Sequence, residues 1–153
     1  MEFSDLMKEF GAKVGIPDLR PGADGVCSLS VDGLELVLAE KPDTDELVLM
    51  AEVGDIPQEG RDQFFRKLLE EMDGSEQTNG AVYSVEPKTK KVFLHQTARL
   101  LLLDAEKLMT MLPAFAEVLR RARSFAADFR ASMTEMEIGK FTSGMGSNAF
   151  IQV

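Results

Sequence analysis

The chain has 153 residues, 44% of them apolar and 28% charged, which is typical of a globular protein with a single core. Its formal net charge is −9, and so acidic a chain is a poor candidate for binding the phosphates of nucleic acids. It contains no apolar run of about 18 residues, so no membrane-spanning helix is predicted.

The first predicted elements are a helix over residues 2–14 and a β-hairpin that turns at Asp32-Gly33. Apolar side chains recur along the helix at spacings of three and four, which gives it one apolar face. A two-residue Asp-Gly turn between alternating apolar residues favours a hairpin, because both turn positions need a positive φ. The turn sets the register, placing one face's side chains in the pairs Val31 with Leu34, Leu29 with Leu36, and Cys27 with Leu38.

A third strand and a second helix are predicted to follow the hairpin. The alternation of apolar residues over residues 47–53 indicates the strand. Asp55 has the character of an N-cap, and Pro57 suits the first turn of a helix that is predicted to reach about residue 72. One stripe of this helix carries Phe64, Phe65, Leu68, Leu69 and Met72.

A second hairpin is predicted over residues 81–86 and 91–100, with Val85 facing Val92 and Tyr83 facing Leu94. The order of elements is therefore helix, three strands, helix, two strands and a final helix. This α-β-β-β-α-β-β-α order predicts an α+β fold, in which helices pack on an antiparallel sheet.

The last predicted helix begins after Asp104, which can cap it, and runs to about Ala131. Pro113 lies inside this helix and is predicted to kink or divide it. After residue 131 the apolar period dissolves into Met, Ser, Thr and Gly, which predicts a loosely ordered tail. The chain is thus divided into a domain over residues 1–131 and a tail over residues 132–153.

The second predicted helix carries more apolar surface than one small sheet requires, because its stripe includes two adjacent pairs, Phe64-Phe65 and Leu68-Leu69. A surplus of apolar surface on a small domain usually marks an interface between subunits. A homodimer is therefore predicted.

The sequence offers no catalytic or metal-binding constellation. His95 is the only histidine, so a histidine-based metal site or a catalytic triad would have no partners of the type it needs. Cys27 lies on the apolar side of a strand, without a histidine or a helix N-terminus to activate it as a nucleophile. A single cysteine also cannot form an internal disulfide, which favours the reducing cytosol. The protein is predicted to be no enzyme and to use no cofactor or metal.

Several short motifs, taken in order, resemble the class I type III secretion chaperones, the Tir-chaperone-like group of small acidic bacterial proteins. Each motif is weak alone, and it is their order and spacing over about residues 3–130 that carry the resemblance. They are Phe10, Val14-Gly15-Ile16-Pro17, Gly25-Val26-Cys27-Ser28-Leu29, Asp32-Gly33, the strand from Leu47 to Gly54, Ile56-Pro57, Leu68-Leu69, Gly80, and Leu100 to Leu103. The tail after Ala131 is longer than usual for such chaperones.

The resemblance implies a homodimer without ATPase activity in the bacterial cytoplasm. Such chaperones hold the N-terminal segment of a secreted effector in an extended form, and the secretion ATPase is a further partner of the group. The first helix and the three-stranded part of the sheet would offer apolar grooves and an edge to the effector. The second helix and the second hairpin would form the dimer interface.

Two sets of residues are predicted from this analogy. The effector-binding set is Leu6, Phe10, Val14, Leu29, Val31, Leu36 and Leu49. The dimer-interface set is Phe65, Leu69, Met72, Tyr83 and Leu94.

Two other functions are compatible with the sequence. A regulatory adaptor or anti-activator of the same fold would bind a cytosolic protein instead of an effector, and composition does not separate it from a chaperone. A small enzyme or ligand-binding domain would instead need a concave site with convergent polar groups.

Overall fold

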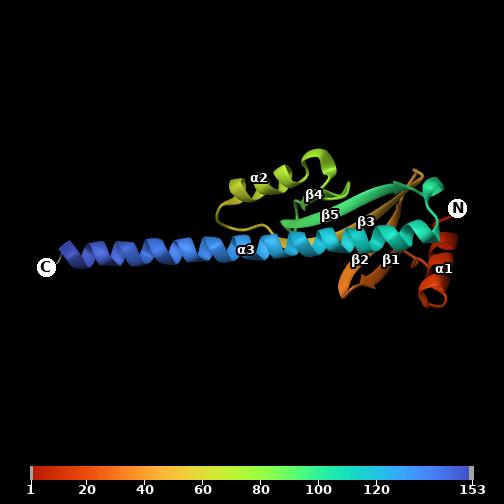
Figure 1. Cartoon of the computed structure of the whole chain (residues 1–153), viewed down its shortest axis with the longest axis horizontal. Coiled ribbons are helices and arrows are strands. Elements are labelled where there is room, and N and C mark those ends of the chain that lie inside the picture. The colour runs from red at the N-terminus through yellow and green to blue at the C-terminus, as the bar shows by residue number, and fades with distance from the viewer. Residues whose placement is uncertain (1, 152–153) are drawn as a thin grey trace.

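The computed structural model describes the backbone of residues 2–151 and the side chains of that range, except those of residues 75, 137 and 140–151. The elements follow the predicted order, with two short 3₁₀ turns added (Figure 1). They are α1 (Phe3–Val14), β1 (Val26–Val31), β2 (Leu34–Lys41), β3 (Glu46–Asp55), α2 (Arg61–Glu71), η1 (Asp73–Ser75), β4 (Val82–Glu86), β5 (Lys91–Arg99), η2 (Leu100–Leu102) and α3 (Ala105–Ile151).

The strands form one antiparallel sheet in the order β1-β2-β3-β5-β4, so that β1 and β4 are its edges. The first hairpin has the predicted register, with a positive φ of 50° at Asp32 and 79° at Gly33. The second hairpin also pairs as predicted, with Val85 opposite Val92 and Tyr83 opposite Leu94. In both hairpins the alternation of apolar side chains sets which face is buried.

One face of the sheet is covered by α3, with α1 beside the N-terminal part of that helix (Figure 1). The apolar stripe of each helix packs against the inward side chains of the strands. Among the side chains described, the largest of those that are fully buried are Phe64, Phe115, Leu6, Met7, Leu36, Leu38, Leu47, Leu49, Leu94, Leu108, Leu112 and Leu119.

The start of the second helix differs from the prediction. β3 runs on to Asp55, and α2 begins only at Arg61, after Gly60 with a φ of 69°. Gly60 also approaches the ring of Phe129 so closely that a Cβ there would lie 3.1 Å from it. The capping pattern at Asp55 was therefore misleading, because a left-handed residue at position 60 does not fit inside a helix that starts at Pro57.

The last helix is longer and more regular than predicted. Asp104 accepts a hydrogen bond from the backbone N–H of Lys107 at 2.8 Å, as expected of an N-cap. α3 is then continuous through Pro113 and reaches Ile151, and its C-terminal part extends beyond the sheet and α2 (Figure 1). Residues 132–151 are thus helical instead of irregular, and residues 152–153 lie outside the described part. The domain boundary near residue 131 stays a prediction.

A cluster of four aromatic rings joins α2 to α3. The ring of Phe64 stacks on Phe125 with centroids 5.5 Å apart and lies 5.3 Å from Phe129 and 5.8 Å from Phe65. Such pairs contribute about 0.5–1.5 kcal/mol beyond the burial of their area. The cluster therefore holds α2 in place beside β4 and β5.

Replacing Phe64 by Ala is expected to lower the free energy of unfolding by about 3–5 kcal/mol, because the ring is fully buried and its removal leaves a cavity. Urea unfolding at one fixed protein concentration measures this change. Leu101→Ala is the control, since Leu101 is 69% exposed and the change should stay within about 0.5 kcal/mol. A loss below about 1 kcal/mol for Phe64→Ala would show that the cluster does not stabilise the fold.

Candidate functional site

The two residues considered as possible catalytic groups, Cys27 and His95, lie apart from each other. Cys27 is 3% exposed in the core, and burial raises the pKa of its thiol, which disfavours the thiolate that a nucleophile requires. His95 lies on the opposite face of the sheet, paired with Met50 of β3 and Val82 of β4. Within the described residues, no group of three or more His, Cys, Asp or Glu side chains is placed to hold a metal ion. No helix among those residues is long and apolar enough to cross a membrane.

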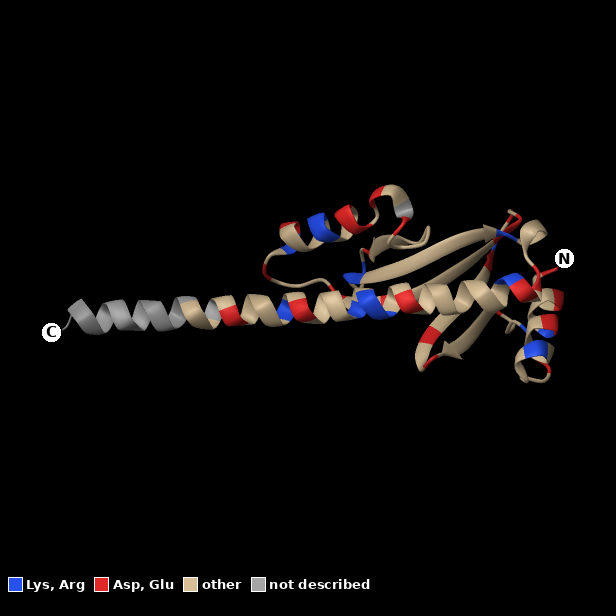
Figure 2. Ribbon diagram, viewed as in Figure 1, with Lys and Arg blue, Asp and Glu red and all other residues tan. Residues whose placement is uncertain are grey.

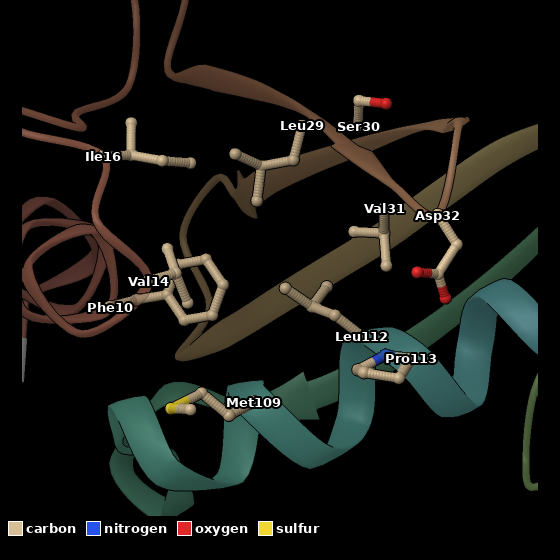
Figure 3. A pocket seen from close by; sticks show the side chains of 10 residues that line it. All are labelled: Phe10, Val14, Ile16, Leu29, Ser30, Val31, Asp32, Met109, Leu112 and Pro113. Carbon is tan, nitrogen blue, oxygen red and sulfur yellow. The ribbon is translucent and has the colours of Figure 1, made fainter.

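A mainly apolar groove of about 360 Å³ lies between α1, β1 and α3, and we call it the β1 groove. Figure 3 shows the apolar side chains of the two helices facing those of β1 across it. Its walls are Phe10, Val14, Ile16, Leu29, Ser30, Val31, Asp32, Met109, Leu112 and Pro113.

The chain after α1 folds back to close one end of the β1 groove. Gly15 takes a left-handed conformation with a φ of 79°, and the N–H of Ile16 donates to the carbonyl of Gly11 at 2.8 Å. A Cβ on Gly11 would lie 2.6 Å from the Ile16 oxygen, so only glycine permits this close return. The return places Ile16 on the groove wall, where its side chain is 42% exposed.

The backbone edge of β1 is open beside the groove. In a two-residue hairpin, the residues next to the turn form a hydrogen-bonded pair, so Val31 and Leu29 direct their N–H and C=O groups toward β2. Ser28 and Ser30 consequently direct theirs away from the sheet. At Val26 this outer side is already taken, because its carbonyl accepts from Gly22 and its N–H donates to Asp24. The free edge therefore begins at Ser28 and ends at the turn.

β1 carries no charged side chain, and Figure 2 shows this strand in tan along its length. Edge strands are commonly protected against pairing with other chains by lysines, prolines or bulges. β1 has none of these, and its register with β2 is unbroken. The strand is thus suited to accept another strand.

Four of the seven residues predicted to bind an effector meet in the β1 groove: Phe10, Val14, Leu29 and Val31. The other three, Leu6, Leu36 and Leu49, are fully buried in the core and reach no groove, because the inner face of the sheet is covered by the helices. The prediction missed the other six lining residues, which are Ile16, Ser30, Asp32, Met109, Leu112 and Pro113. Met109 is 41% exposed beside the buried stripe of α3, but nothing in the sequence shows which strand that part of the helix crosses.

A second apolar hollow, of about 210 Å³, lies between α2 and the β4 edge of the sheet. Four predicted dimer-interface residues line this α2–β4 hollow: Phe65, Leu69, Met72 and Tyr83. Leu94, the fifth, is fully buried in the core and is not available to a partner. The Tyr83 hydroxyl donates to Glu71 at 2.8 Å, and burial together with this carboxylate raises the pKa of the phenol. Leu69 is 64% exposed at the rim.

The chain shares its fold with proteins in several solved complexes. The chain is similar to one in the HopA1–SchA chaperone–effector complex, with 16% identity, a TM-score of 0.65, and coverage of 78% of this chain and 91% of that one. It is similar to one in the ExsC–ExsE complex, with 21% identity, a TM-score of 0.66, and coverage of 81% and 96%. It is also similar to one in the complex of the Yersinia pestis type III secretion chaperone SycH with a fragment of YscM2, with 15% identity, a TM-score of 0.62, and coverage of 79% and 99%.

Because the sequence identities to these three structures are low, the structural similarity establishes the fold and nothing more. No sequence among the curated proteins matches the chain. The model of one protein family does match, and its match covers residues 5–123, from α1 into α3. The matched residues include the β1 groove, the α2–β4 hollow and the whole sheet. The match agrees with the resemblance that the sequence motifs carry. The chain belongs to the Tir chaperone protein (CesT) family.

Proposed function

We propose that the protein is a cytosolic type III secretion chaperone that holds the N-terminal segment of a secreted effector in an extended form. The observation that carries this proposal is the open, uncharged β1 edge directly beside an apolar groove. Such an arrangement recognises an unfolded segment by backbone pairing along the edge and by apolar side chains in the groove. The family match and the similar chaperone–effector structure support it.

Binding of this kind needs no chemical step. An extended segment gains about 25 cal/mol for each Å² of apolar surface that it buries, which offsets the cost of ordering it. The protein would therefore act by binding and release, without a cofactor, and keep its client stable and competent for secretion. The secretion ATPase would receive the loaded chaperone.

The α2–β4 hollow would join two copies of the chain. Its exposed apolar rim includes Leu69, and the neighbouring strand β4 is a sheet edge with Val82 40% and Val85 42% exposed. A symmetric dimer would place this surface against itself and leave the β1 groove of each copy free for a client.

Affinity purification from cells that assemble a type III secretion system tests the function. Mass spectrometry of the retained proteins should identify a secreted protein, and limited proteolysis of the complex should protect a segment near that protein's N-terminus. Recovery of a folded dimer that retains no secreted protein would contradict the proposal. Retention of a cytosolic regulator instead would favour the adaptor or anti-activator.

A further inference from the structure

The β1 groove contains a carboxylate, that of Asp32, to which no hydrogen bond or ion pair is made by the other described side chains. Asp32 lies at the hairpin turn, is exposed, and lines the groove next to Pro113. Figure 3 shows its carboxylate turned toward α3 at the end of the groove remote from Phe10. Among the described residues, Asp32 accepts no side-chain hydrogen bond and forms no ion pair.

The helix α3 carries a further backbone acceptor, at Met109. Pro113 is inside α3 and has no N–H, so the carbonyl of Met109 lacks the donor that it would have in an uninterrupted helix. Met109 and Pro113 are four residues apart, hence on the same side of α3, and both line the groove. No lysine, arginine or histidine is among the residues that line it. The nearby Lys13 at the end of α1 is already paired with Glu106.

We propose that the client segment bound along β1 carries a lysine or arginine whose charge is held by Asp32. This inference rests on the proposed function and specifies the client. Two apolar client side chains opposite Leu29 and Val31 enter the groove, since they share the face of those residues. The next client residue on that face lies about 7 Å further along, level with the Asp32 turn.

The expected recognition pattern is therefore apolar, any residue, apolar, any residue, then lysine or arginine, read in either chain direction. Charge complementarity supports a cation, because the chain has a net charge of −9 and the groove supplies acceptors without a charged donor. A solvent-exposed pair of this type changes affinity by up to roughly fivefold.

Fluorescein-labelled peptides test the inference by fluorescence polarisation. One peptide contains Ile-Ser-Val-Ser-Lys between serine and glycine spacers, a second carries Gln in place of Lys, and each is also made in the reverse order. The wild-type dimer should bind the better Lys peptide roughly fivefold more tightly than its Gln counterpart. Asp32→Asn should remove this preference and leave the affinity for the Gln peptide unchanged, since asparagine tolerates the φ of 50°.

Asp43→Asn is the matched control, because Asp43 also has a positive φ, of 61°, in the turn between β2 and β3. This variant should keep the preference for Lys. Equal binding of the Lys and Gln peptides by the wild type, or a preference that persists in Asp32→Asn, would overturn the inference and leave the proposed function standing. Binding of neither peptide would contradict strand pairing at β1, and with it both proposals.

Discussion

Replacing Leu69 by Glu is expected to dissociate the proposed dimer into monomers. Leu69 is 64% exposed at the rim of the α2–β4 hollow, so the substitution leaves the monomer's core intact. In a symmetric dimer the change occurs twice in one interface, and each buried carboxylate without a partner costs several kcal/mol. The dimer dissociation constant should rise by at least about 100-fold. Light scattering coupled to size-exclusion chromatography measures the mass directly.

The control for this experiment is Leu101→Glu, at the η2 turn. Leu101 is 69% exposed, so it matches Leu69 in side chain and exposure but lies outside the α2–β4 hollow. This variant should stay dimeric, and both variants should keep the far-ultraviolet circular dichroism of the wild type. A Leu69→Glu protein that remains a dimer at low concentration would show that the two copies meet elsewhere.

Replacing Met109 by Lys is expected to weaken client binding by at least about tenfold, since a buried methionine side chain contributes about 1.5–3 kcal/mol. Met109 is 41% exposed on the wall of the β1 groove, and the lysine would also place a charge in this mainly apolar wall. Lysine favours helix, so α3 should be preserved. Isothermal titration with the client segment recovered by affinity purification gives the two affinities.

Met136→Lys provides the comparison on the same helix. Met136 is 53% exposed on α3 and does not line the groove, so the same substitution there should leave the affinity unchanged. An equal loss in both variants would assign the effect to the helix as a whole. No loss in Met109→Lys would place the client outside the β1 groove.

The strand registers could be predicted because the information is local. The Asp32-Gly33 turn fixes both φ angles and hence the pairing of every residue in the first hairpin, and the structure has that register. The cap at Asp104 is local in the same sense, since it needs only the N–H three residues further on. Where a turn or a cap determines the geometry, the sequence is sufficient.

The boundaries of α2 and α3 depend on packing, which the sequence does not show. The start of α2 is set by the approach of Gly60 to Phe129, a contact between residues far apart in the chain. α3 remains continuous at Pro113, and its side chains are buried in the core on both sides of that residue, at Leu112 and at Phe115. Tertiary contacts thus outweigh the local preference of a proline to end a helix.

The candidate site was only partly predicted, and the reason is similar. Apolar periodicity identified the inward faces, but it does not separate a side chain at the middle of a face from one at its border. Leu36 and Leu49 lie on central strands and belong to the core. Leu29 and Val31 lie on the edge strand and line the groove. The order of strands in the sheet decides between these outcomes, and that order is set by contacts distant in sequence.

Binding of a client along β1 can be examined by amide hydrogen exchange of the protein, free and bound to its client segment. The N–H groups of Ser28 and Ser30, which face outward in the free protein, should exchange rapidly in the free protein and become protected in the complex. Those of Leu29 and Val31 should be protected in both states by their pairing with β2. Unchanged exchange at Ser28 and Ser30, with new protection confined to β4 or α2, would contradict binding of the client along β1.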